Sequence, residues 1–173
     1  MDVKYRLIID IFAHPYIDKK LWIFKADIDW SKTEIEIGDN DDNYIKWHNG
    51  IWEDGTWEDG IWMNGIWKNG TWQDGIWYDG KWHNGIWENG WWYGDIWYDG
   101  TWRDGVWKNG TWKNGTWEKG IWEKGTWQDG IWHKGTWHNG TWIKGKIYNS
   151  KTKQYESSEV SPNKCKWSLS YGR

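Results

Sequence analysis

Residues 46–145 repeat a five-residue unit twenty times without interruption, in the form x-Trp-x-[Asp/Asn/Lys]-Gly. Trp holds the second place in every unit, and Gly holds the fifth place in all units but one, where the last two residues are Gly94 and Asp95. The first place is mostly Ile or Thr. Regular glycine and β-branched residues both oppose a helix. The unit therefore predicts an all-β fold, with a short strand and a tight turn that needs left-handed backbone at glycine.

Two architectures fit this unit. In a β-solenoid, each unit forms one side of a coil and the coils stack as parallel strands. Four sides per coil would turn the twenty units into five complete coils. In an antiparallel β-meander, each Asp/Asn-Gly pair forms a two-residue hairpin loop and all the indoles fall on one face. That face would expose far more apolar surface than a monomer usually shows, so the ribbon would have to roll up or pair. Burial of the indoles favours the solenoid.

In the solenoid the second-place tryptophans point inward and form stacked columns. The free variation of the third place, beside an unvarying tryptophan, is what a packed column would produce. The predicted structural core is Trp47, Trp52, Trp57, Trp62, Trp67, Trp72, Trp77, Trp82, Trp87, Trp92, Trp97, Trp102, Trp107, Trp112, Trp117, Trp122, Trp127, Trp132, Trp137 and Trp142.

Residues 1–45 are predicted to form an N-terminal β cap. Three stretches in it, 5–12, 22–30 and 33–37, are rich in β formers or alternate apolar with polar residues. An antiparallel unit of these strands would cover the first edge of the array, which would otherwise expose unpaired backbone.

Residues 146–173 lose the repeat and are predicted to form the C-terminal cap. Tyr148–Lys151 has the composition of a turn, 156–164 that of a loop, and 165–169 that of a last strand. The chain thus divides into 1–45, the array at 46–145, and 146–173.

Charge and composition exclude several classes of partner. The chain carries 22 Lys and Arg against 25 Asp and Glu, a net charge of -3, which argues against nucleic acid as a partner. No apolar run reaches membrane-spanning length, and nothing near Met1 has the pattern of a signal peptide. A cytoplasmic or virion location is expected.

We expect no catalytic residue, metal site or cofactor, and so no enzyme. An active site needs unlike groups that converge, whereas repeats place like groups in rows. His133 and His138 hold the third place in adjacent units but lack a third ligand. The single cysteine, Cys165, has no flanking motif and is expected to be packed. The acidic turn at 39–43 begins like a calcium loop, but Tyr44 and Gly50 occupy the places that need Gly and Glu.

Four aromatic residues outside the second place form the candidate binding surface. Tyr78, Trp91, Tyr93 and Tyr98 occupy first or third places near the irregular Gly94–Asp95, where side chains should point outward. Exposed aromatic residues of this kind are typical of binding spots.

The five-residue period with one large inward residue resembles the pentapeptide-repeat proteins, which fold as four-sided right-handed β-helices. That family places Leu or Phe at the centre with Asp or Asn just before it; here Trp is central and Ile or Thr precedes it. The element Trp-x-Asn-Gly, as in Trp67–Gly70, resembles the turn of MORN repeats. Tandem Trp-x-x-Gly units also resemble those of uncharacterised proteins of bacteriophages and large DNA viruses.

The repeat indicates a non-catalytic structural or interaction protein that binds a protein partner or itself. The resemblance implies a viral setting, such as a virion accessory, fibre or host-interaction protein. One alternative is a carbohydrate-binding module that uses the surface aromatic residues. A second is a DNA mimic that acts on a topoisomerase, as some pentapeptide-repeat proteins do, although the nearly balanced charge opposes it.

Overall fold

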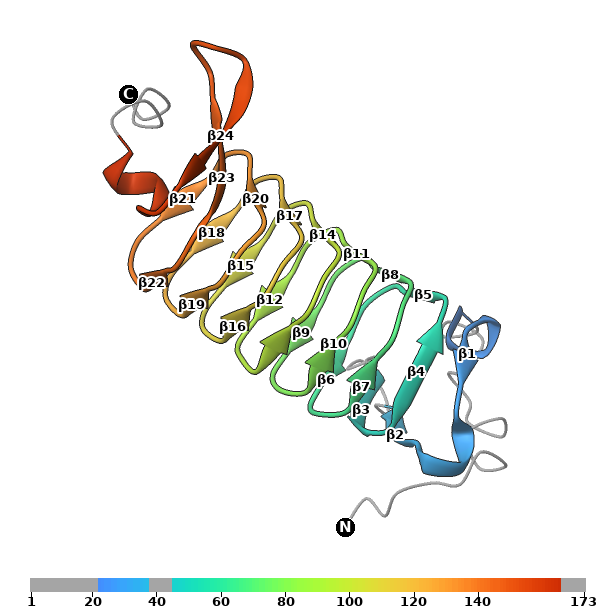
Figure 1. Cartoon of the computed structure of the whole chain (residues 1–173). Helices are drawn as coiled ribbons and strands as arrows, with labels where there is room; N and C mark the ends of the chain where they lie inside the picture. The colour runs from blue at the N-terminus through green and yellow to red at the C-terminus, as the bar shows by residue number, and fades with distance from the viewer. Residues whose placement is uncertain (1–21, 38–44, 166–173) are drawn as a thin grey trace.

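The computed structural model describes residues 22–37 and 45–165 and shows a three-sided β-solenoid (Figure 1). Each unit of the repeat contributes one short strand to one of three eight-stranded sheets, and every third unit returns to the same sheet. We name the sheets after one strand of each, β10, β11 and β12. The solenoid prediction is thus confirmed, and the meander is wrong because the strands of the array pair in parallel.

The strands of each sheet follow one another along the array. The β10 sheet contains β1 (Asp27–Ile28), β4 (Ile51–Asp54), β7 (Ile66–Trp67), β10 (Lys81–Trp82), β13 (Ile96–Trp97), β16 (Thr111–Trp112), β19 (Thr126–Trp127) and β22 (Thr141–Trp142). The β11 sheet contains β5 (Thr56–Trp57), β8 (Thr71–Trp72), β11 (Ile86–Trp87), β14 (Thr101–Trp102), β17 (Thr116–Trp117), β20 (Ile131–Trp132), β23 (Gly145–Asn149) and β24 (Gln154–Ser158). The β12 sheet contains β2 (Glu34–Ile37), β3 (Ile45–Asn49), β6 (Ile61–Trp62), β9 (Ile76–Trp77), β12 (Trp91–Trp92), β15 (Val106–Trp107), β18 (Ile121–Trp122) and β21 (Thr136–Trp137).

The expectation of four sides per coil is wrong. Within the array each strand pairs in register with the strand fifteen residues on, so that Trp82 lies opposite Trp67 and Trp97. The size of the indole accounts for the difference. Trp47, Trp52 and Trp57 of one coil form a closed triangle of edge-to-face rings, with centroids 5.9–6.5 Å apart. Three indoles meet at the axis, and a fourth side would open a void that packed interiors avoid.

The inward tryptophan columns are confirmed, since all twenty second-place indoles are buried. Rings fifteen residues apart stack face to face, with centroids 4.6–5.0 Å apart and planes within 3–8°. Rings five residues apart meet edge to face. Both geometries are those that aromatic quadrupoles favour. The core is therefore three continuous indole stacks that support one another side by side.

Burying the indoles also buries their polar N–H groups, which is unfavourable where no acceptor is in reach. Trp67, Trp117 and Trp122 each donate Nε1–H to a turn carbonyl seventeen residues on, at 3.1–3.2 Å. Among the described residues, fourteen other indoles bury this group without a hydrogen-bond partner. An unpaired buried donor costs about 1–3 kcal/mol. Burying an indole of about 200 Å² returns about 5 kcal/mol at 25 cal/mol per Å². Apolar burial therefore outweighs the lost hydrogen bonds.

The left-handed backbone that the sequence predicted at the fifth-place glycine is confirmed by its positive φ, although the values exceed those of a left-handed helix. Gly100 has φ of +121°, and seventeen other glycines of the array have φ between +112° and +141°, far from the left-handed helical value of about +57°. A Cβ on Gly100 would also lie 2.4 Å from the carbonyl oxygen of Gly85 in the preceding coil. Glycine is thus required both for the backbone angle and for the close approach of successive coils.

The fourth-place residue satisfies the glycine N–H. In nine turns the Oδ1 atom of Asp or Asn accepts a hydrogen bond from the next residue's N–H at 2.7–2.9 Å. Where Lys119 or Lys134 takes the fourth place, its own N–H donates to a carbonyl of the preceding coil instead.

Antiparallel strands cover both ends of the array (Figure 1). At the first end β2 pairs with β3, as expected for 33–37, and β1 pairs with β4. The strand predicted at 22–30 is wrong except at β1. Residues 22–25 form 3-10 helix, and η2 spans Trp30–Lys32. The Trp22 ring packs edge to face against Trp57, with centroids 5.2 Å apart. Trp22 therefore covers the end of the core instead of extending along a strand.

At the second end β23 continues the β11 sheet and turns back into β24, and this hairpin projects from the array (Figure 1). The predicted turn lies at 150–153. The loop prediction for 156–164 is wrong in part, because β24 runs to Ser158 and η3 spans Pro162–Lys164. Cys165 is buried against Ser158, and burial raises the pKa of its thiol.

The expectations for 5–12, for the acidic turn at 39–43 and for a strand beyond Cys165 lie outside the described residues. No helix within 22–37 and 45–165 has both the length and the apolar character needed to cross a bilayer.

Candidate binding surface

The outer face of the β12 sheet, hereafter the β12 face, is formed by the first and third places of every third unit. Its first-place column and its third-place column are largely apolar in the middle of the array. The apolar members are Ile61, Ile76, Trp91, Val106 and Ile121 in the first place and Met63, Tyr78 and Tyr93 in the third. No single unit reveals this column, because its members stand fifteen residues apart.

Exposed apolar side chains concentrate on this face. Among the described residues seven large hydrophobic side chains are exposed, and four of them lie here: Tyr78 at 41%, Trp91 at 45%, Tyr93 at 38% and Ile121 at 39%. The other three lie in the last coil or the C-terminal cap. Single exposed apolar residues are ordinary, whereas a cluster on one face is typical of an interaction site.

The aromatic rings of the β12 face are packed against one another. Tyr78 and Tyr93 stack with centroids 5.1 Å apart, and Trp91 lies 6.4 Å from Tyr93 with nearly parallel rings. Lys108, one coil further on, places Nζ 4.8 Å above the Trp91 ring and pairs with Glu123 at 2.6 Å. A cation over an indole face contributes about 0.5–1 kcal/mol at an exposed site. The rings are therefore held in place before any ligand binds.

The structure separates Tyr98 from the other three residues of the predicted surface. Tyr98 follows β13 and belongs to the β10 sheet, where it stacks on His83 at 4.7 Å with planes 3° apart. Lys113 lies 4.3 Å above the same ring from the following coil. Burial, together with Lys81 and Lys68, lowers the pKa of His83, which favours the neutral imidazole in this stack.

The irregular corner Gly94–Asp95 lies between these two faces. Asp95 takes the left-handed φ of +69°, whereas Gly94 has no positive φ. The Asp95 carbonyl still accepts the Thr111 N–H at 2.8 Å, so the exchange of the two residues leaves the ladder intact. Burial, and then the neighbouring Asp79, raise the pKa of the Asp95 carboxyl.

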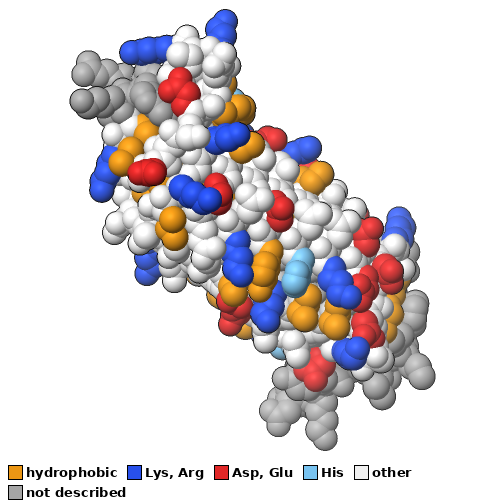
Figure 2. Space-filling view, in the orientation of Figure 1, with side chains coloured by type: hydrophobic (Ala, Val, Ile, Leu, Met, Phe, Trp, Pro, Cys, Tyr) orange, Lys and Arg blue, Asp and Glu red, His pale blue; other side chains and the backbone are white. Residues whose placement is uncertain are grey.

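The other two faces carry ion-paired rows along the array. Lys68 pairs with Glu53 on the β10 face, and Arg103 pairs with Glu88 on the β11 face, both at 2.8 Å and fifteen residues apart. Figure 2 shows basic, acidic and apolar side chains following one another along the body of the solenoid. Exposed pairs of this kind contribute little stability, about 0–1 kcal/mol each.

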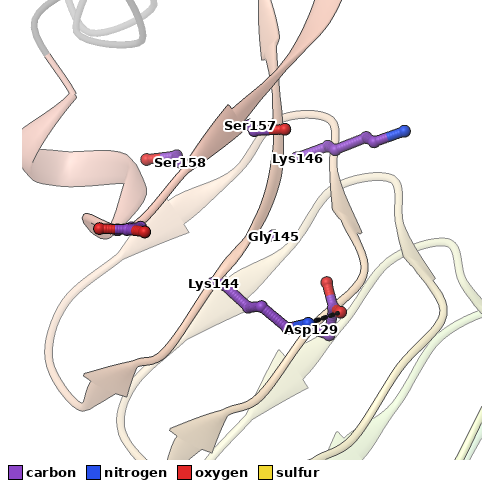
Figure 3. A pocket seen from close by; sticks show the side chains of 7 residues that line it. Asp129, Lys144, Gly145, Lys146, Ser157 and Ser158 are labelled. Carbon is purple, nitrogen blue, oxygen red and sulfur yellow. Dashed lines mark ion pairs between the residues drawn. The ribbon is translucent and has the colours of Figure 1, made fainter.

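Two hollows lie beside the C-terminal hairpin. The larger, about 500 Å³, is lined by Lys144, Lys146, Ser157 and Glu159, with Lys144 paired to Asp129 at 3.0 Å (Figure 3). The smaller, about 340 Å³, includes His133, whose Nδ1 lies 2.9 Å from the Tyr155 hydroxyl. His133 and His138 belong to different sheets, because adjacent units occupy different sides of the coil. Within 22–37 and 45–165, no group of three His, Cys, Asp or Glu side chains gathers as a metal site requires.

No protein-family model, curated protein or solved structure matches the chain. The repeat and its fold are thus the basis for any functional inference.

Proposed function

We propose that this chain is a non-catalytic interaction protein, in which the solenoid is a rigid scaffold and the β12 face binds a protein partner. The observation that carries the proposal is that four of the seven large hydrophobic side chains exposed in the described part of the chain lie on this one face. A virion or host-interaction setting is part of the proposal, and its support is the resemblance of the Trp-x-x-Gly units to those of phage and large-virus proteins.

The orientation of the rings favours a protein partner over a carbohydrate. Sugars and bases stack on free aromatic faces. Tyr93 has one face against Tyr78, and Trp91 has Lys108 over its ring. Tyr98 is held between His83 of the preceding coil and Lys113 of the following coil. The rings therefore offer mainly edges and apolar area, which suit the packed centre of a protein interface.

A photo-crosslinking side chain at a single position tests this proposal. Benzoylphenylalanine in place of Trp91 should yield discrete adducts with a protein, identified by mass spectrometry, in cells that express the chain. The same side chain in place of Ile86 is the matched control, because Ile86 holds the same first place on the polar β11 face. Equal adducts at both positions, or none at position 91, would contradict a binding role for the β12 face.

A further inference from the structure

Two rows of charged corner residues border the β12 face. One row precedes the face in each coil and the other follows it, and both come from the fourth place of the repeat. Acidic residues lie toward the N-terminal end of these rows, and basic residues lie toward the C-terminal end. The acidic members are Asp59, Asp74, Asp79 and Asp104, and the basic members are Lys119, Lys124 and Lys134; Asp104 is half-buried and the other six side chains are exposed.

We propose that the partner of the β12 face is a second copy of this chain, bound antiparallel about a two-fold axis midway between β12 and β15. This inference rests on the proposed function of the β12 face. A two-fold axis that lies in the interface and runs parallel to the strands brings each corner row against its own copy in reverse order, as an isologous interface requires. In this arrangement, whenever two charged corner residues of the two copies face each other, their charges are opposite.

The charge pairs follow from counting coils on either side of that axis. Asp79 lies one and a half coils before the axis and Lys124 lies the same distance after it, so each faces the other in the partner copy. By the same count Asp59 faces Lys134, and Asp74 faces Lys119, which already pairs with Asp104 of its own chain at 2.7 Å. Within the described residues no ion pair involves Asp59, Asp79, Lys124 or Lys134. These four charges are therefore available for a partner.

The same axis also pairs the first-place and third-place columns of the β12 face with those of the partner copy. Trp91 meets Val106 of the partner copy, and Ile76 meets Ile121. In the third place, Tyr93 meets Lys108, which already contacts an aromatic ring within its own chain. Apolar residues thus meet apolar residues in the first place, whereas in the third place the rings of Tyr93 and Tyr78 meet Lys108 and Glu123.

Other registers bring like charges together. Moving the axis one half-coil back, onto β12, sets Asp95 against its own copy and Asp74 against Asp104. Moving it one half-coil forward, onto β15, sets Lys108 and Asp104 each against its own copy. A parallel pair of solenoids would place Asp74 against Asp79 and Lys119 against Lys124. Like-charge contacts of this kind oppose association, so the charges select one register.

The small area of the β12 face limits the affinity of this dimer. The seven strands from β3 to β21 span roughly 29 Å at about 4.8 Å per strand, and the face is only a short strand and its corners wide. Such an area lies at the low end for specific interfaces. We therefore expect a dimer with a dissociation constant in the micromolar range that weakens as salt screens the rim charges.

Sedimentation of the full chain between about 5 and 200 μM tests the inference. The wild type should dimerise, and each of the single variants Asp79→Lys and Lys124→Glu should weaken the dimer about tenfold. The double variant Asp79→Lys/Lys124→Glu should dimerise nearly as well as the wild type, because the reversed charges again face each other. Lysine occurs at this place of the repeat, so the turn tolerates Asp79→Lys.

Asp99→Lys is the matched control, since Asp99 has the same turn contact, with Gly100 N–H at 2.7 Å, at a corner away from the β12 face. It should leave dimerisation unchanged, and circular dichroism should show all variants folded. A wild type that is monomeric throughout the range overturns the inference. So does a double variant as weak as either single one. A monomer whose position 91 nevertheless crosslinks to a different protein would overturn the inference and leave the proposed function standing.

Discussion

Replacing Trp92 with alanine is expected to lower the free energy of unfolding by about 3–5 kcal/mol, the usual cost of removing a buried Trp side chain. Trp92 is buried and stacks between Trp77 at 4.9 Å and Trp107 at 5.0 Å. Its removal breaks one indole column and leaves a cavity that the stiff neighbouring coils cannot fill. Urea unfolding followed by circular dichroism measures the loss.

The adjacent Trp91 provides the control within the same strand. It holds the first place, points outward and is 45% exposed. Its replacement with alanine should change the free energy of unfolding by less than about 1 kcal/mol, in the range of surface substitutions, because its contacts with Lys108 and Tyr93 are weak. Equal losses for the two variants would contradict the inward position of the second place.

Replacing Gly100 with alanine is expected to destabilise the chain by about 3–5 kcal/mol. Two costs add: a φ of +121° that L-residues rarely adopt, and a Cβ placed 2.4 Å from the Gly85 carbonyl oxygen. The neighbouring coils would have to separate to admit the methyl group. Thermal and urea unfolding of the variant measure the effect.

Gly94 is the matched control, because it is the one glycine within a repeat unit that is displaced to the fourth place. Its φ is not positive, and the nearest atom to an added Cβ is the Tyr78 carbonyl oxygen at 3.3 Å. Gly94→Ala should change the free energy of unfolding by less than about 1 kcal/mol. A cost as large as that of Gly100→Ala would mean that the fifth place is not special.

The five-residue period was enough to predict the class of fold. A tryptophan that never varies beside a third place that varies freely indicates one buried and one exposed position, and burial of so many indoles favoured parallel coils. The number of sides could not be predicted, because one unit specifies a corner without its angle. That angle depends on a glycine φ near +120° and on three indoles meeting at the axis.

The first cap shows where alternation misleads. Trp22, Phe24 and Ile28 have the spacing of a strand, yet Trp22 belongs to a 3-10 turn that places its indole on the end of the core. At the end of an array, covering the exposed rings outweighs local strand preference.

The candidate site was predicted in part. Their first or third places beside the irregular Gly94–Asp95 marked Tyr78, Trp91 and Tyr93, which the structure brings together. Tyr98 is only five residues beyond Tyr93, so the sequence suggested one shared surface. A corner of the coil lies between them and places them on different faces. Ile121 and Lys108 were missed because their membership of the face appears only when residues fifteen apart are compared. The number of residues in one coil is thus what the sequence did not reveal. Without it, neither the number of sides nor the membership of the β12 face could be predicted.

A pair of engineered cysteines tests the fifteen-residue coil most directly. In a Cys165→Ser background, Thr101→Cys/Thr116→Cys joins register partners on adjacent parallel strands of the β11 sheet, within the Cα separation that a disulfide needs. This pair should oxidise readily to an intramolecular disulfide, whereas Thr101→Cys/Ile121→Cys, twenty residues apart and on different sheets, should stay reduced under the same conditions. Crosslinking of the second pair and not of the first would contradict the three-sided solenoid.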